Sequence, residues 1–144
     1  MKFAPDVIAG DALSTAASGM AAQRVRMNVL ANNLANVRTT RDARGRFAPY
    51  LRKEVLFRAA RINPNKPDEQ GVLVHGIEPG RRPYVLIHEP GHPESDASGY
   101  RKVPAVSVPR EMATMIEASR AYEANLSAMK LAGGALDRTT TILG

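Results

Sequence analysis

Apolar residues recur every seven positions in the first third of the chain. Ala, Leu and Val fill positions three or four residues away, which is the pattern of a helix with one apolar stripe. This pattern predicts a helix from about Asp11 to Val37, with Asp11 and Ser14 as candidate caps at its start. Gly19 is its predicted weak point, because a glycine destabilises a helix interior by about 1 kcal/mol. The stripe consists of Leu13, Met20, Met27 and Leu34.

The last third of the chain has a cleaner heptad pattern, which predicts a second helix from about Pro109 to Leu143. Pro109 suits the first turn, and Glu111 suits the positive end of the helix dipole. Two interleaved series of seam positions continue along this helix without a shift in register. The first series is Met112, Ser119, Leu126, Gly133 and Thr140, and the second is Met115, Tyr122, Met129, Leu136 and Leu143.

Between these helices the pattern changes to short alternating or β-branched runs, separated by loops rich in Pro, Gly and Asn. Strands are predicted at Tyr50–Arg58, Gly71–Glu78 and Tyr84–His88. Three or four strands of this length predict one small antiparallel sheet with a small core of its own.

Together these elements predict an α+β fold. Two long terminal helices pair as a coiled-coil-like inner part, and a small antiparallel β insert connects them. The N-terminal helix occupies residues 1–37, the outer insert residues 38–109 and the C-terminal helix residues 110–144. We expect both helices to contribute to an assembly seam, which consists of Leu13, Met20, Met27, Leu34, Met112, Met115, Tyr122, Leu126, Met129, Leu136 and Leu143.

The seam has two interpretations from the pattern alone. In one, the helices form an ordinary hairpin that the sheet caps. In the other, the small and flexible seam residues pack too weakly for a lone hairpin, and neighbouring copies complete the packing in an oligomer or polymer.

The charge of the chain is concentrated in its middle. The net charge is +6, and residues 38–110 alone carry fourteen basic and eight acidic residues. Within them, the segment Arg38–Arg61 holds eight basic residues against two acidic ones. Such a run is usually a solvated face, but it also suits an acidic partner or nucleic acid. A basic nucleic-acid-binding module is therefore the alternative function, with Phe47, Tyr50 and Phe57 interleaved among its charges.

Cysteine usage and hydropathy exclude several classes of protein. The chain has no Cys, which rules out disulfides and thiolate chemistry. It has no run of about 20 apolar residues, so no membrane span is predicted. Its first residues lack the apolar core of a Sec signal peptide, so we expect no cleaved leader of that type.

The segment His88–His92 reads HEPGH and matches H-E-x-x-H, the zinc-protease signature. In that signature two His side chains share a metal from one face of a helix, with the Glu as general base. Pro90 removes a helical hydrogen bond at a cost of about 3 kcal/mol. The remaining histidine, His75, lies in a strand-like run. We therefore predict a turn without catalytic zinc, formed by Pro90, Gly91, His92 and Pro93.

Other catalytic arrangements are also missing from the sequence. The three His are scattered, and no Gly-rich phosphate loop precedes a helix. Ser119, Tyr122 and Lys130 do not form a nucleophile–base set at helical spacing. We expect no enzymatic activity and no cofactor.

Three stretches of the chain carry a resemblance to a known family. Residues 20–40 read MAAQRVRMNVLANNLANVRTT, an apolar heptad that leads into ANNLAN. Residues 84–100 read YVLIHEPGHPESDASGY, and residues 111–130 read EMATMIEASRAYEANLSAMK. The chain resembles the flagellar axial proteins in the order and spacing of these stretches, and its middle stretch is similar to a loop of the proximal rod proteins. The family motif residues are Asn28, Asn32, Asn33, Asn36, Ser119, Arg120, Tyr122, Glu123 and Asn125.

The resemblance implies a structural subunit of the proximal rod in the bacterial flagellar basal body. Such subunits leave the cell through the flagellar type III export apparatus without a cleaved signal peptide and reside in the rod, which crosses the periplasmic space. The terminal helices are expected to form the inner part of the rod and the insert its outer part. The implied partners are the other proximal rod proteins, the distal rod protein and the export apparatus, with self-association in the rod and no nucleic acid.

The motif residues suggest contacts of two kinds. The four Asn of the first motif lie near one helix face, and their amides can cap the helix end or bridge subunits. Capping by Asn36 alone is the simpler alternative. In the second helix Arg120 and Glu123 are i, i+3 partners. Tyr122 needs a hydrogen-bond partner if it is buried, either in the core or across a subunit interface.

Overall fold

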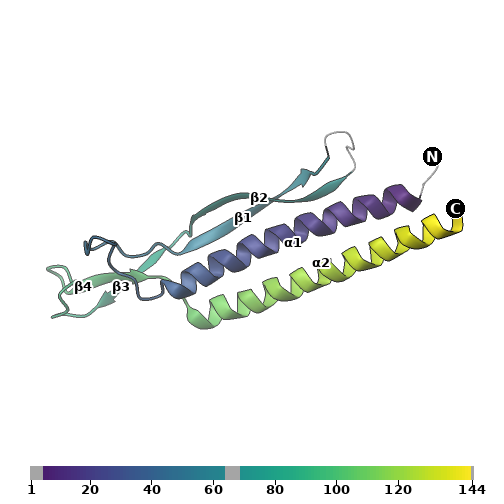
Figure 1. The fold of residues 1–144 in the computed structure, drawn as a ribbon. Coiled ribbons are helices and arrows are strands. Elements are labelled where there is room, and N and C mark those ends of the chain that lie inside the picture. The colour runs from purple at the N-terminus through teal and green to yellow at the C-terminus, as the bar shows by residue number, and fades with distance from the viewer. Residues whose placement is uncertain (1–4, 64–68, 144) are drawn as a thin grey trace.

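Two long helices and two β-hairpins form the part of the chain that the structure describes (Figure 1). The structure is a computed structural model that describes residues 5–63 and 69–143, with side chains described for residues 10–63, 69–138 and 141. Helix α1 (Pro5–Ala35) and helix α2 (Val108–Leu143) run antiparallel, so the start of α1 and the end of α2 lie at the same end of the molecule (Figure 1). The α+β fold class is confirmed.

The first hairpin lies along α1 on the side away from α2 (Figure 1). Strand β1 (Lys53–Arg61) pairs antiparallel with strand β2 (Gln70–Pro79) over the length of both strands. The register shifts between Leu56 and Phe57, which marks a β-bulge that bends the hairpin. The elongated body of the molecule therefore has three layers, in the order hairpin, α1, α2.

The second hairpin lies beyond the end of the molecule where α2 begins (Figure 1). It pairs strand β3 (Tyr84–His88) with strand β4 (Tyr100–Pro104), where no strand is predicted from the pattern. The two hairpins form separate two-stranded sheets, so the prediction of a single sheet is wrong. The reason lies between β2 and β3, where Gly80 N donates to Arg52 O (2.9 Å) and Arg52 N donates to Pro83 O (3.2 Å). The backbone of this connection is bonded to the segment before β1, and β2 and β3 do not pair.

Most buried apolar side chains of the described residues lie on the helices, namely Ala16, Ala22, Val29, Leu30 and Ala118. In the insert Pro104, at the end of β4, is buried, and a single proline forms no core. The expectation that the insert has its own core is therefore wrong for its described residues, 38–63 and 69–109. A two-stranded hairpin is marginal in water by itself, and the first hairpin uses one face of α1 as its second layer.

The start of α1 differs from its prediction. The helix begins at Pro5, which suits a first helical position, so Asp11 and Ser14 lie inside it and do not cap it. Ser14 Oγ lies 3.2 Å from the Gly10 carbonyl oxygen and 3.0 Å from the Asp11 carbonyl oxygen in the preceding turn. The last helix, by contrast, begins within one residue of the predicted Pro109 and ends at the predicted Leu143.

Candidate functional site: the helix pair and its polar contacts

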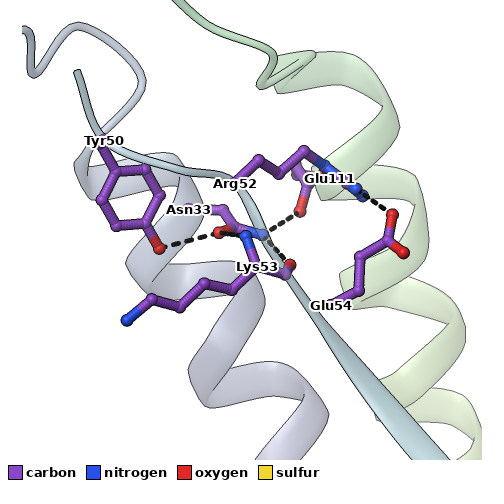
Figure 2. A network of polar contacts seen from close by, with 6 residues as sticks. All are labelled: Asn33, Tyr50, Arg52, Lys53, Glu54 and Glu111. Carbon is purple, nitrogen blue, oxygen red and sulfur yellow. Dashed lines mark hydrogen bonds and ion pairs between the residues drawn. The ribbon is translucent and has the colours of Figure 1, made fainter. Parts of the chain in front are cut away.

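A buried amide joins the end of α1 to the start of β1 and the start of α2 (Figure 2). Asn33 has 0% of its surface exposed. Its Nδ2 donates to the Lys53 carbonyl (2.9 Å) and to Glu111 Oε2 (3.1 Å). Its Oδ1 accepts from the Lys53 backbone N–H (3.0 Å) and the Tyr50 hydroxyl (2.9 Å). An amide side chain can donate two hydrogen bonds and accept two at the same time. This network therefore requires an asparagine at position 33.

Glu111 completes this network from the first turn of α2 and is 1% exposed. Its Oε1 accepts from Arg52 Nε (2.7 Å), and the same guanidinium also pairs with Glu54 (Figure 2). Burial acts to lower the pKa of Arg52, but its hydrogen bonds to Glu111 and Glu54 outweigh burial and raise that pKa. Burial, together with the charge of Glu111, also raises the pKa of the Tyr50 hydroxyl. Arg52 therefore stays charged and Tyr50 stays a hydrogen-bond donor at neutral pH.

Hydroxyl groups hold the other half of the first hairpin on α1. Thr15 Oγ1 donates to the Gln70 carbonyl (2.8 Å), and the Val72 N–H donates to Ser18 Oγ (3.1 Å). The Ser14 hydroxyl donates to the carboxylate of Glu69. We call Ser14, Thr15 and Ser18 the hydroxyl row.

The backbone of β2 approaches α1 closely at Gly71. A Cβ atom at Gly71 would lie 2.5 Å from Ser18 Oγ and 2.3 Å from Ile62 Cδ1. The absence of a side chain at Gly71 therefore lets the backbone of β2 reach the hydroxyl row. Sequence reasoning missed this contact, although three hydroxyl residues at i, i+1 and i+4 in an Ala-rich helix are a pattern that points to it.

The predicted assembly seam lies partly between α1 and α2. Met20, Tyr122 and Met129 line one shallow hollow together with Ala17 and Ala21. Seam residues that are half-buried are Leu13, Met20, Met27, Leu34, Met115, Tyr122, Leu126, Met129 and Leu136. Met112 is 53% exposed, and the side chain of Leu143 lies outside the described residues. A role of these residues between subunits stays a prediction.

Gly19, the predicted weak point of α1, faces Asn125 of α2. A Cβ atom at Gly19 would lie 2.9 Å from Asn125 Nδ2, and that amide donates to the Ala121 carbonyl of its own helix (2.9 Å). The glycine therefore allows close packing of the two helices, which offsets part of its cost in helix propensity.

Of the other motif asparagines, one forms local hydrogen bonds and two are exposed to solvent. Asn36 donates from Nδ2 to the Asn32 carbonyl (2.9 Å) and accepts from the Thr39 hydroxyl (3.1 Å), which closes the end of α1. The side chains of Asn28 and Asn32 are exposed, and bridging between subunits stays a prediction for them.

On α2 the acidic motif residue has a different partner from the predicted one. Glu123 Oε1 accepts from the Ser119 hydroxyl (3.5 Å), and Arg120 is exposed. Within the described residues the structure contains no Arg120–Glu123 ion pair at bonding distance.

The HEPGH segment is a turn, as predicted. His88 is the last residue of β3 and its ring lies 4.8 Å from the Tyr100 ring. The His92 N–H donates to the Glu89 carbonyl (3.2 Å), and His92 Nδ1 accepts from the Glu94 N–H (3.1 Å).

Gly91, in the same turn, has a φ of 101°, a conformation that favours glycine. Across residues 5–63 and 69–143, no three His, Asp or Glu side chains come together in an arrangement suited to a metal ion. That HEPGH binds no catalytic zinc stays a prediction.

Neither helix of the described chain combines the length and apolar character needed to cross a bilayer.

Comparison with known proteins assigns the chain to a class. Residues 13–41, most of α1 and the turn after it, match the family described as "Flagella basal body rod protein". Residues 97–142, which include β4 and nearly all of α2, match "Flagellar basal body rod FlgEFG protein C-terminal". Both matched segments are thus similar to flagellar basal-body rod proteins.

Individual relatives narrow this class to one family. The chain is 42% identical to the flagellar basal-body rod protein FlgC of Borreliella burgdorferi, over 78% of this chain and 83% of that protein. It is 37% identical to FlgC of Salmonella typhimurium, over 88% and 92% of the two chains, and 33% identical to FlgC of Bacillus subtilis, over 90% and 95%. The chain belongs to the FlgC family of flagellar basal-body rod proteins, which confirms the resemblance seen in the sequence.

Proposed function

We propose that this chain is a structural subunit of the proximal rod and that it assembles with its neighbours through α1 and α2. The coarser part of this role, a structural component of the flagellar basal-body rod, follows from membership of the family. The finer proposal includes export through the flagellar export apparatus without a cleaved signal peptide, a place in the periplasmic part of the rod, and contacts with other proximal rod proteins and the distal rod protein.

The observation that carries this proposal is the large surface of the single chain. Its solvent-accessible surface is 10121 Å². A compact monomer of 15.6 kDa exposes about 7,200 Å², so this chain exposes about 2,900 Å² more. A typical stable interface buries about 800 Å² on each partner. The excess therefore corresponds to the area buried in contacts with about three to four neighbours, which suits a subunit inside a rod.

Most of the exposed large apolar side chains of the described residues lie in the insert, but four lie on α2. Val108, Met112 and Ile116 are spaced by four residues along one side of the helix and are 40%, 53% and 56% exposed. Leu131, farther along α2, is 76% exposed. Fully burying such a side chain stabilises a contact by about 1.5–3 kcal/mol, so covering the exposed half of each contributes roughly 1 kcal/mol. The exposure of these apolar side chains supports the proposal that α2 contacts neighbouring subunits.

A structural role leaves no need for catalysis. Among the described residues the most deeply buried polar side chains, Asn33 and Glu111, are bonded to each other, and Asn33 is also bonded to the Lys53 backbone, which suits a structural role. We therefore propose that the chain is not an enzyme.

The segment Arg38–Arg61 is the basis of the second candidate function, nucleic-acid binding. Phe47 is 45% exposed and Phe57 is 37% exposed, as a stacking surface requires. Three of the eight basic residues of the segment are in ion pairs, however: Arg41 with Glu94, Arg46 with Asp42, and Arg52 with Glu54 and Glu111. A salt titration of nucleic-acid binding tests this candidate, which requires a counterion-release slope of several units.

Deletion of the gene in its host tests the proposed function. The expected result is a cell without filaments whose basal bodies retain the membrane ring but have no completed rod, and re-expression of the chain should restore filaments. Normal filaments in the deletion strain, or a tagged functional chain that is missing from isolated basal bodies, would contradict the proposal.

A further inference from the structure

An open hollow lined by arginine side chains lies where the first hairpin, the second hairpin and the start of α2 meet. It has a volume of about 680 Å³. Arg81, Arg82 and Arg110 line it, together with Arg52, Glu54 and Glu111. We call this site the arginine hollow. Three of its guanidinium groups, those of Arg81, Arg82 and Arg110, form no ion pair in the described part of the chain.

The two carboxylates of the hollow do not neutralise these three groups. Glu111 Oε1 accepts from Arg52 Nε at 2.7 Å, and Glu54 pairs with the same guanidinium. Because Arg52 already serves both carboxylates, the hollow keeps an excess of positive charge at Arg81, Arg82 and Arg110.

The backbone that carries Arg81 and Arg82, whose side chains are exposed, is held in place. Gly80 N donates to Arg52 O (2.9 Å), and Pro83 O accepts from Arg52 N (3.2 Å) and from Ala105 N (3.0 Å). Both ends of the two-arginine turn are therefore tied to neighbouring segments. A site that is fixed before binding loses less conformational entropy when a ligand arrives.

Arg110 lies at an electrostatically unfavourable position. It is in the first turn of α2, where the helix dipole and the unbonded N–H groups carry positive charge. A cation there opposes the dipole, and two more arginines line the same hollow. An anion in the hollow would relieve all of these repulsions together.

We propose that the arginine hollow receives acidic side chains from a neighbouring rod subunit. This inference rests on the proposed rod function and names the chemistry of one of its contacts. Guanidinium groups bind carboxylates through paired, charge-assisted hydrogen bonds. The apolar part of the lining, Val85, Pro104 and Val106, suits the aliphatic stems of Asp and Glu and reduces competition from water.

The hollow suits a protein carboxylate better than nucleic acid. The arginines surround a single hollow, whereas binding of a nucleic-acid backbone requires cations spread along the path of its phosphates. Its lining contains no aromatic side chain on which a base could stack.

The test is charge reversal in the full chain, expressed in a host that lacks its own copy. For Arg110→Glu we expect incorporation into isolated basal bodies to fall by about tenfold or more, since a charge pair at an interface is replaced by a repulsion. The same substitution places a negative charge at the positive end of α2, so the thermal midpoint of the purified variant should equal or exceed that of the parent. Lost assembly without lost stability is a result that damage to the fold would not produce.

Two further variants complete the test. The double variant Arg81→Glu/Arg82→Glu should lose incorporation to a similar extent, and a selection for regained motility should yield Asp or Glu replaced by Lys, Arg or a neutral residue in a neighbouring rod protein. Arg58→Glu is the matched control, because Arg58 is exposed on β1 and does not line the hollow, and it should be incorporated like the parent.

The outcomes separate this inference from the proposed function. If the parent chain and all hollow variants enter basal bodies equally, the inference is wrong and the rod function stands. The inference is also wrong if the hollow variants assemble normally but lose salt-sensitive binding to a short DNA duplex. If the parent chain itself is missing from basal bodies, the proposed function is wrong.

Discussion

Helix α1 and helix α2 share one interface, but their remaining faces differ. Helix α1 lies between the first hairpin and α2 (Figure 1). Among the described side chains of the two helices, α1 contributes four buried apolar residues, Ala16, Ala22, Val29 and Leu30. Among the same described side chains, α2 contributes Ala118, and it exposes Val108, Met112, Ile116 and Leu131. The single chain is therefore built around α1, whereas α2 divides its surface between the fold and, on our proposal, its neighbours.

The largest effect is expected where the two helices and the hairpin share one side chain. Asn33→Leu removes four hydrogen bonds and leaves the Lys53 backbone and Glu111 with unsatisfied buried groups. The free energy of unfolding should fall by about 3–5 kcal/mol, measured by chemical denaturation. Asn32→Leu is the control, because Asn32 is exposed and its side chain is outside this network, and it should change stability by less than about 0.5 kcal/mol. Equal losses of stability in the two variants would show that the Asn33 network does not hold α1, the hairpin and α2 together.

The next effect separates the two faces of α2. Ile116→Asp changes a side chain that is 56% exposed, so stability should change by less than about 0.5 kcal/mol while incorporation into the rod is lost. Leu136→Asp changes a half-buried side chain of the predicted seam, so it should lower both stability and incorporation. Leu73→Asp, an exposed apolar residue of β2, is the control and should be incorporated normally. Normal motility with Ile116→Asp would refute an assembly role for the exposed face.

A smaller effect is expected at the contact between the first hairpin and α1. Gly71→Val places a side chain against Ser18 and Ile62, and it should destabilise the chain by about 1–3 kcal/mol. Hydrogen exchange should show the loss first in β2 and not in α2. At Gly76 a Cβ atom would meet its nearest neighbour at 3.7 Å, so Gly76→Val should be tolerated better. If both variants behave alike, close packing at Gly71 does not hold the hairpin.

The smallest effect concerns pH and a contact remote from both helices. Burial acts to raise the pKa of Glu94, but the Thr40 hydrogen bond and the Arg41 charge outweigh it and lower that pKa. A carboxyl with a lowered pKa in the folded state stabilises the fold above its unfolded pKa of about 4.3, and this contribution disappears as pH falls through the folded value. Stability should therefore decline slightly less in acid for Glu94→Gln than for the parent. An identical acid profile of the two proteins would show that the Glu94 contact contributes nothing.

The sequence predicted α2 and most of α1, because each is a long segment with a seven-residue apolar repeat, but it placed the start of α1 six residues too late. It did not predict that β2 and β3 belong to different sheets, because that depends on backbone bonds from Arg52 to Gly80 and Pro83. A periodic pattern contains no information on such bonds.

The polar network was missed for a similar reason. Asn33 and Glu111 are 78 residues apart in the sequence and meet only after the helices pair. Asn33 was identified as one of four motif asparagines, and Glu111 was assigned to the helix dipole. The sequence pattern indicates that Asn33 and Glu111 matter, but only the fold shows that they bond to each other.

The hydroxyl row has a consequence for how the sequence of such a chain can change. Thr15 and Ser18 bond to the main chain of β2, at the Gln70 carbonyl and the Val72 N–H. Every residue type except proline offers both of these groups. Positions 70 and 72 can therefore exchange side chains freely without loss of this contact, whereas Thr15 and Ser18 cannot lose their hydroxyls. The outward surface of the hairpin is thus open to variation between species, while the helix that supports it is constrained.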